Sequence, residues 1–173
     1  LSVSIGISVM LIALGVIYGF KKEISTALGG FGAHVTITAL EGNNSLETPP
    51  ITTDVNYPSK ISQLDNVKNI HKFARKAGIV KNDNVMEGIM LKGLGQDFDW
   101  SFYEQMLIRG SLPRVSDSMR TRDVLISEVM AKRLNLDTAS KVEMIFIQNQ
   151  PRRDLYKVSG IYRSNFEEMD KIL

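Results

Sequence analysis

The chain opens with twenty residues, LSVSIGISVMLIALGVIYGF, that carry no charged side chain, and every Asp, Glu, Lys and Arg comes after them. Twenty apolar residues in a helix span roughly 30 Å, the thickness of a bilayer core. The pattern predicts a transmembrane helix that begins upstream of Leu1 and continues as a polar stalk to residue 28. A signal peptide and a buried helix of a soluble protein are the alternatives. A signal peptide has its basic residues before the apolar part, whereas Lys21 and Lys22 come after it.

Small residues recur along one side of this segment. Ser4, Ser8, Gly15 and Gly19 follow one another at spacings of 4, 7 and 4 residues, which places them on one helical face. Gly15 and Gly19 together allow a second helix to approach closely within lipid. We expect these residues to form a helix-packing face, and a chance distribution of residues common in membrane helices is the alternative.

Alternating and helical hydrophobic patterns then succeed one another along the chain. They predict, in order, a strand over 33–40, a short helix from Pro58, a hairpin of strands 67–83 and 84–95, a helix over 96–110, a strand over 124–126, a helix over 127–136, and strands over 141–148 and 154–162. Asp97 or Asp99 is the expected N-cap of helix 96–110, and Gly110 is its expected end. Ser127 is the expected N-cap of the next helix. This order is typical of a mixed α+β domain.

Composition limits the possible functions. Of the 173 residues, 43% are hydrophobic and 23% are charged, as in an ordinary folded chain. The formal net charge of +2 argues against a nucleic-acid-binding protein, which needs a strong basic field. Cysteine is absent, which excludes disulfides, thiolate metal sites and thiol nucleophiles.

Few residues offer candidate chemistry. His34 and His71 each fall within a predicted strand and have no second metal ligand at helical spacing, so we interpret both as solvated strand residues. The chain contains no HExxH, GxSxG or GxxxxGK[ST] sequence. We therefore predict no catalytic, cofactor-binding or metal-binding residue in this chain.

A basic run crosses the first strand of the predicted hairpin and contains Lys68, Lys72, Arg75, Lys76 and Lys81. Such a run could bind anionic lipid or nucleic acid. On an extended strand, however, the charges divide between the two faces. We therefore favour a solvated edge strand that is protected from aggregation by its lysines.

An acidic stretch closes the chain, with Asn165, Glu167, Glu168 and Asp170 after the last predicted strand. Paired carboxylates can perform general acid–base catalysis, and calcium needs oxygen ligands at alternating positions around a turn glycine. The stretch NFEEMD has no such glycine. We interpret it as a solvated turn, with a catalytic or metal site as the alternative.

Four longer stretches follow one another along most of the chain: YGFKKEISTALGGFGAHVTIT, GIMLKGLGQDFD, IRGSLPRVSDSMRTRDVLISEVMAKRLNLDTASKVEMIF and YKVSGIYRSNFEEMD. In this order they resemble the permeases of the FtsX/MacB type and, within them, the LolC/LolE-like lipoprotein-release branch of ABC transporters. The resemblance implies an α+β fold in which an N-terminal transmembrane helix leads into a periplasmic domain. That domain has a porter-like mixed α/β part and a β-rich inserted part.

The resemblance also implies domain boundaries. Residues 1–28 correspond to the transmembrane helix and stalk, and 29–95 to the first half of the porter-like subdomain. Residues 96–165 correspond to the β-rich middle subdomain. Residues 166–173 correspond to the return to the porter-like subdomain, whose remainder we expect outside this chain.

The implied partners are a cytoplasmic ATPase subunit that binds ATP, a second permease subunit of the same or a different kind, a periplasmic carrier or adaptor protein, and the lipid bilayer. No nucleic-acid partner and no cofactor in this chain are implied. The implied location is the bacterial inner membrane, with the soluble domain in the periplasm. The implied function is to couple ATP hydrolysis to lipoprotein release toward the outer membrane. An efflux or cell-wall-regulating permease of the FtsX type is one alternative, and the sensor ectodomain of a membrane receptor is another.

Two departures from the family pattern matter. The segment DTASK at 137–141 stands where relatives have Gly-Asp, and Asn165 stands where they have a glycine. Asn tolerates the left-handed backbone that glycine supplies.

A further departure from the family pattern is a short connection between the last two predicted strands. In the lipoprotein-release branch, the matching hairpin is long and captures a periplasmic carrier. Here its residues Gln150, Pro151, Arg152 and Arg153 are the candidate partner-binding residues, because arginines can pair with an acidic surface. An ordinary exposed turn is the alternative.

Overall fold

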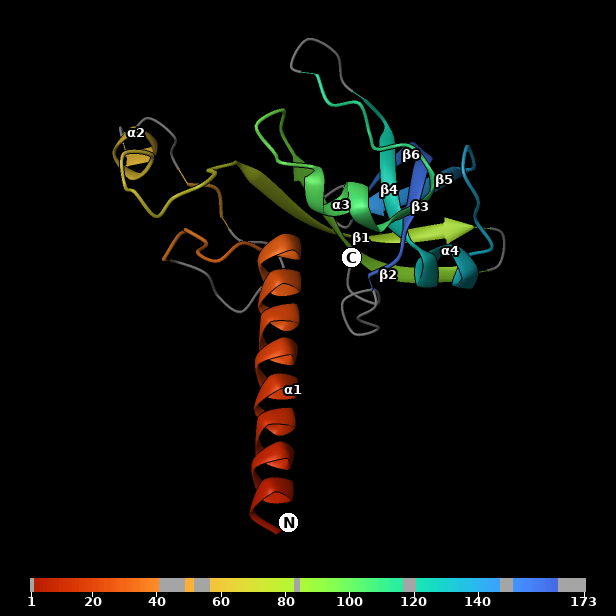
Figure 1. Ribbon diagram of the computed structural model, residues 1–173. Helices are drawn as coiled ribbons and strands as arrows, with labels where there is room; N and C mark the ends of the chain where they lie inside the picture. Colours follow the sequence, from red (N-terminus) through yellow and green to blue (C-terminus); the bar gives the residue numbers. More distant parts are fainter. Residues whose placement is uncertain are drawn as a thin grey trace. The chain divides into compact units, whose positions relative to one another are not determined.

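The computed structural model describes residues 2–40, 49–51, 57–82, 85–116, 121–146 and 151–164. The chain divides into two compact units, Leu1–Ile37 and Thr38–Leu173. The first unit is built on one long helix, and the second unit is built on a sheet with short helices (Figure 1). The coarse prediction of an N-terminal apolar helix followed by an α+β domain is confirmed.

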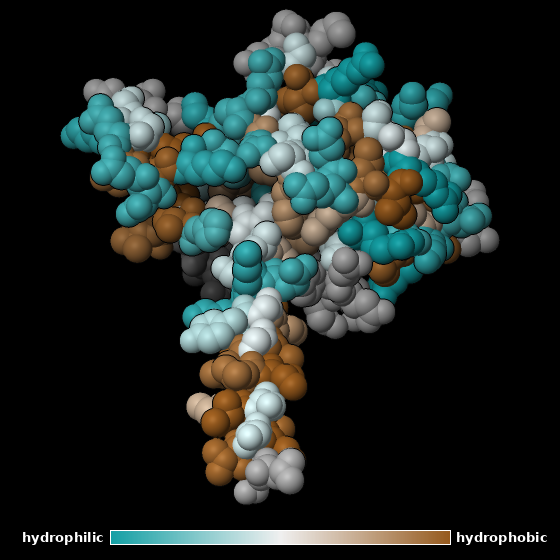
Figure 2. All heavy atoms as spheres, in the orientation of Figure 1, coloured by the Kyte–Doolittle hydropathy of each residue, from teal (hydrophilic) through white to brown (hydrophobic). Residues whose placement is uncertain are grey.

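The first unit contains helix α1, Ser2–Phe31. Its stretch Val3–Phe31 is long and apolar enough to cross a membrane by length and composition. Figure 2 shows hydrophobic side chains along this helix, interrupted by a paler stripe. The helix ends where the Gly32 amide donates to the Leu28 carbonyl at 3.0 Å. It therefore extends beyond the stalk that was expected to end at residue 28.

The strand predicted over 33–40 is wrong. The structure gives this segment no strand pairing, and Val35, Ile37 and Leu40 are exposed. A strand needs a neighbour that satisfies its backbone N–H and C=O groups. No strand pairs with residues 33–40 in the part of the chain that the structure describes. The segment 33–40 therefore joins no described sheet, although its apolar and polar residues alternate.

The second unit contains a six-stranded sheet whose strands come from distant parts of the sequence (Figure 1). Its elements are α2 (Tyr57–Ile61), β1 (Phe73–Asn82), β2 (Val85–Leu94), α3 (Ser101–Met106), β3 (Leu107–Gly110), β4 (Asp123–Ser127), α4 (Glu128–Arg133), β5 (Lys141–Phe146) and β6 (Arg152–Tyr162). The sheet order is β2-β1-β5-β6-β3, and β4 also pairs with β6. Among the described strands, only β4 and β6 pair in parallel.

Strands β1 and β2 form the predicted hairpin, with Phe73 opposite Leu94 and Asn82 opposite Val85. The second half of β1 also pairs with β5, through Gly78 and Phe146 among others. Strand β1 therefore lies inside the sheet, and its interpretation as an edge strand is wrong. This pairing joins strands from both sides of residue 95, where the resemblance places a subdomain boundary. A shared sheet does not by itself decide how the chain divides, and the division into 29–95 and 96–165 stays a prediction.

The core lies on one face of the sheet, beneath α4. Its members are the buried side chains of Val80, Val124, Ile126, Met130, Ala131, Leu134, Leu136, Val142, Met144, Phe146, Val158 and Ile161. Alternate residues of β5 supply it, as the period of a half-buried strand requires, and β6 adds Val158 and Ile161. Helix α4 contacts both β4 and β6.

The strand–helix junction at Ser127 has the predicted form. Strand β4 ends at Ser127, whose hydroxyl oxygen accepts a hydrogen bond from the Met130 amide at 3.2 Å. This is the N-cap interaction that stabilises the first turn of a helix. The helix ends with Asn135 at a φ of 50°, and the Leu136 amide donates to the Ala131 carbonyl at 2.8 Å.

The prediction of one helix over 96–110 matches the structure only over Ser101–Met106. Helix α3 ends at Met106, and Leu107–Gly110 forms β3, which pairs with the end of β6. The N-cap residue is Trp100, although Asp99 accepts a hydrogen bond from the Ser101 amide at 3.0 Å. Tertiary pairing with β6 overrides the helical pattern of the segment. Gly110, at a φ of 77°, ends the strand rather than the helix.

The turn before β5 contains a backbone conformation that suits glycine. Ala139 has a φ of 68°, in the left-handed region where a Cβ is unfavourable. Its amide donates to the Val158 carbonyl at 2.8 Å, and this bond holds the turn against β6. The segment lies where the family resemblance expects a glycine, and Ala139 adopts a backbone conformation that favours glycine.

We predict that Ala139→Gly stabilises the domain by about 1 kcal/mol, because it removes the left-handed strain of a residue with a Cβ. Urea unfolding in detergent, followed by the fluorescence of the single tryptophan, Trp100, measures the change. The matched change Ala131→Gly, inside α4, should destabilise by about 1 kcal/mol or more. Destabilisation by both changes would contradict the assignment of strain to Ala139.

The end of β6 is tied to α4 by an ion pair. The Arg163 guanidinium donates to both carboxylate oxygens of Glu128, at 2.6 and 3.1 Å. Lys132, one turn along α4, lies 3.0 Å from the same carboxylate. Hydrogen bonds from Arg163 and then Lys132 lower the pKa of Glu128 from 4.5 to about 2.

This pKa shift predicts a pH dependence of stability. The ionised Glu128 contributes stability above pH 4.5, and the contribution is lost as pH falls toward 2. The difference in urea midpoint between wild type and Glu128→Gln should therefore be largest at neutral pH and shrink between pH 4.5 and 2. The same comparison in an Arg163→Gln background should show a smaller pH dependence. A wild-type-to-variant difference that stays constant with pH would exclude this ion pair as its source.

Candidate functional site

The candidate partner-binding residues lie at the β5–β6 end of the sheet. Gln150 lies outside the described residues, and Pro151 is exposed just before β6. Arg152 and Arg153 are the first two residues of β6 and pair with Phe146 and Ile145 of β5. The two arginines are therefore strand residues on opposite faces of the sheet rather than neighbours in a loop.

Both arginines have acidic neighbours within the domain. Arg152 lies 3.0 Å from Asp154, and Arg153 lies 3.6 Å from Glu143. Their side chains remain 55% and 71% exposed, so a partner can still reach them. Exposed ion pairs of this kind contribute about 0–1 kcal/mol to stability. These ion pairs orient the guanidinium groups, but they are weak enough for a partner to replace the acidic neighbours.

Arg153 lies beside apolar side chains on the face of the sheet opposite the core. Ile145 is its direct neighbour on β5, and Ile79 of β1 is the next residue across the sheet. Leu155, two residues along β6, is 45% exposed. We name Ile79, Ile145, Arg153 and Leu155 the outer sheet patch. Arg153 was predicted from its charge alone, although strand alternation also places Leu155 on the same face.

The small residues Ser4, Ser8, Gly15 and Gly19 all lie within α1. The Ser8 hydroxyl donates to the Ser4 carbonyl at 2.9 Å, so it satisfies its hydrogen bond within the helix. A Cβ at Gly15 or Gly19 would meet no atom within 4 Å. The helix geometry fits a packing face, and its packing against another helix remains a prediction.

Neither histidine lies in a strand, contrary to expectation, although His34 is exposed as expected. His71 precedes β1, is half-buried and contacts Phe98 edge-on at 4.8 Å between ring centres. Burial, and then the charge of Lys92, lower its pKa, while Asp97 acts in the opposite direction. His34 follows α1 and lies outside any strand.

An aromatic cluster connects the segment around α3 to β6. Phe98 contacts Trp100 at 5.0 Å, and Tyr103 contacts Tyr162 at 5.5 Å, both edge-on. Burial raises the pKa of Tyr103 to about 12, so its phenol remains neutral. The cluster borders a mainly apolar cavity of about 310 Å³ that β2, β4 and the core also line. We interpret this region as part of the core packing.

Candidate catalytic groups are not brought together in the described residues. Within the ranges given above, no three His, Cys, Asp or Glu side chains are placed to hold a metal ion. The acidic stretch with Asn165, Glu167, Glu168 and Asp170 lies outside the described residues. The interpretation of that stretch as a solvated turn therefore stays a prediction.

The fold and these surfaces define a class of protein: an α+β domain that follows a candidate membrane helix and carries exposed arginines at one end of its sheet. No protein-family model matches the chain. The chain is 24% identical over 182 residues to the lipoprotein-releasing system transmembrane protein LolC of Buchnera aphidicola subsp. Schizaphis graminum. It is also 24% identical over 187 residues to LolC of Xylella fastidiosa strain Temecula1.

These similarities cover almost all of this chain but less than half of each relative. They include 96% and 99% of the chain, respectively, and 41% of each relative. A second Xylella fastidiosa protein, from strain 9a5c, has the same name and the same coverage. The chain therefore spans about two fifths of the length of the curated relatives it matches. The resemblance to LolC-like permeases of lipoprotein release is confirmed.

We predict that Arg152→Ala together with Arg153→Ala weakens binding of a periplasmic partner roughly tenfold, because interface arginines often contribute more than 1 kcal/mol. Because the two arginines lie on opposite faces, the single changes should reveal which face of the sheet binds the partner. We expect the larger loss of affinity for Arg153→Ala, because Arg153 belongs to the outer sheet patch. Arg133→Ala, which removes an exposed cation near Glu87, is the matched control.

Pull-down of candidate periplasmic proteins measures these changes, and Trp100 fluorescence checks that the domain stays folded. Unchanged binding of every candidate partner by the double variant would remove these arginines from the site.

Proposed function

We propose that this chain is part of a permease subunit of an ABC transporter that releases lipoproteins from the membrane. The observation that carries the proposal is the similarity to proteins named LolC, which extends over nearly the whole chain. The order of an apolar N-terminal helix and a mixed domain supports it. In this proposal the helix lies in the inner membrane and the domain lies in the periplasm.

The proposed mechanism separates energy supply from substrate handling. A cytoplasmic ATPase subunit hydrolyses ATP, and a second permease subunit completes the membrane complex. The small-residue face of α1, with Gly15 and Gly19, suits close packing between membrane helices. Movement of the membrane helices then displaces the periplasmic domains, and this chain itself is not an enzyme.

The β5–β6 end of the sheet is the proposed contact for a periplasmic carrier or adaptor. Arg152 and Arg153 supply exposed positive charge, and the outer sheet patch supplies apolar surface. Charge of this kind accelerates encounter with an acidic partner and sets its orientation. Both arginines lie on a paired strand, so the partner would meet a preformed surface.

Depletion of the protein from its own cells tests the proposed function. We expect mature lipoproteins destined for the outer membrane to accumulate in the inner-membrane fraction, because their release requires the permease. Affinity purification of the tagged protein from membranes should recover an ATPase subunit.

The alternatives give different outcomes. Normal lipoprotein sorting combined with loss of dye efflux would favour an efflux permease, and a septation defect would favour a cell-wall-regulating one. Co-purification with a kinase module instead of an ATPase would favour a receptor ectodomain.

A further inference from the structure

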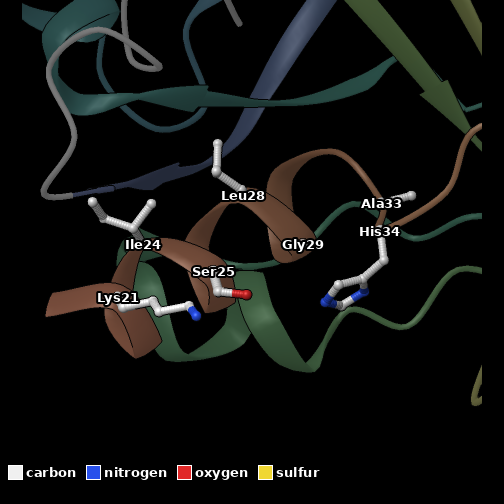
Figure 3. Close-up of a pocket in the computed structure, with 7 residues that line it drawn as sticks. All are labelled: Lys21, Ile24, Ser25, Leu28, Gly29, Ala33 and His34. Atoms are coloured by element: carbon white, nitrogen blue, oxygen red, sulfur yellow. The ribbon is translucent and has the colours of Figure 1, made fainter. Parts of the chain in front are cut away.

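Polar side chains gather at the end of α1, just after its uncharged part. Lys21 and Ser25 lie one turn apart on one face of the helix. The chain reverses after Phe31 and brings His34 back beside the same face. Figure 3 shows the Lys21 and Ser25 side chains pointing toward the His34 ring. One cation and two further hydrogen-bonding groups therefore face a common space.

This space is an open pocket of about 520 Å³ within the first unit. Ile24 and Leu28, also one turn apart, form its apolar side. Glu23 is two residues from Lys21, so it lies on the far side of the helix and does not line the pocket. The lining is therefore cationic, polar and apolar, without a carboxylate.

Gly29 makes the arrangement possible. It continues the face of Lys21 and Ser25 by one more turn, and the His34 imidazole occupies the space where a side chain would lie. A Cβ on Gly29 would be 2.7 Å from both Cε1 and Nε2 of His34. No Cβ approaches ring atoms so closely, so any other residue would displace the imidazole. The glycine is thus required for the pocket rather than for a turn.

The position of the pocket along the helix limits its ligand. The uncharged stretch ends at Phe20, and charged residues begin at Lys21. Since the pocket's ligand rests on the membrane-spanning role proposed for α1, this change of polarity marks the edge of the hydrocarbon core. Lys21 and Ser25 then fall within the next turn or two, at the depth of the lipid head groups. A ligand at this place has its polar part beside Lys21 and its apolar part beside Ile24, Leu28 and the membrane.

We propose that this pocket binds the phosphate group of a membrane phospholipid, with Lys21 as the cationic contact and Ser25 and His34 as hydrogen-bond donors. Phosphate accepts charge-assisted hydrogen bonds from ammonium groups. The apolar wall favours a lipid over a free anion, because it meets the first carbons of an acyl chain. The bound lipid fixes the depth of the helix in the bilayer.

Binding of fluorescently labelled phosphatidylglycerol to the full chain in a neutral detergent tests the proposal. Lys21→Gln should weaken binding about tenfold or more, which is the contribution of one charge-assisted hydrogen bond. Lys22→Gln is the matched control, because Lys22 does not line the pocket. It should weaken binding at most about fivefold, the general contribution of one surface lysine.

The decisive variant changes no charge. Gly29→Ala should weaken binding about tenfold, because its Cβ displaces His34 from the pocket. Gly6→Ala is its control in the same helix, since a Cβ there meets no atom within 4 Å, and it should leave binding unchanged. Circular dichroism should show that both variants keep the helix. Equal binding by Gly29→Ala and wild type would overturn the proposal in favour of general attraction between lysines and lipid.

Competition identifies the ligand. Unlabelled phosphatidylglycerol should displace the probe, whereas inorganic phosphate and uncharged diacylglycerol should not. Displacement by millimolar inorganic phosphate would overturn the assignment to a lipid, and displacement by diacylglycerol would overturn the role of the phosphate.

Discussion

Pairing of β6 on both of its edges is the constraint on which the rest of the domain depends. The second half of β6 pairs with β4 along one edge and with β3 along the other, so Gly160 lies opposite both Leu125 and Gly110. A Cβ on Gly160 would lie 2.7 Å from the Ser111 carbonyl oxygen and 3.0 Å from the Leu125 side chain. Only a residue without a side chain permits this close approach. Strand β6 also pairs with β5, which in turn pairs with β1. Val80 of β1 and Val124 of β4, more than forty residues apart, therefore belong to one core.

The same strand connects the core to the candidate partner surface. Its buried end supplies Val158 and Ile161 to the core, while its first residues carry the exposed Arg152 and Arg153. A site on a paired strand keeps its geometry better than one on a free loop, since neighbouring backbone hydrogen bonds fix it. The proposed lipid pocket is also built on a regular element, because the absence of a side chain at Gly29 lets the His34 ring pack against α1. Both surfaces belong to a chain whose relatives act at a membrane by name.

Much of the fold could be predicted from local patterns. The uncharged N-terminal stretch, the hairpin of β1 and β2, and the Ser127 junction each have a short-range signal, namely apolar length, alternation around a turn, and an N-cap. Three predictions failed where distant pairing decides the outcome. Residues 33–40 alternate but have no described partner strand, and Leu107–Gly110 has a helical pattern but pairs with β6. Strand β1 was expected at an edge of the sheet but also pairs with β5. The two arginines were selected as a candidate site from their type and position, and their role stays a prediction. Their separation onto opposite faces was missed, because it depends on where β6 begins.

The central structural claim is that residues on both sides of position 95 form one sheet organised by β6. Hydrogen–deuterium exchange of the backbone amides measures this most directly, because amides of one cooperative unit exchange through the same opening. We expect the amides of 78–82 in β1, 141–146 in β5 and 157–162 in β6 to be protected to a similar degree and to lose protection together in mild denaturant. Loss of protection over 73–94 while 121–162 stays protected would contradict the account, and it would place a domain boundary at residue 95.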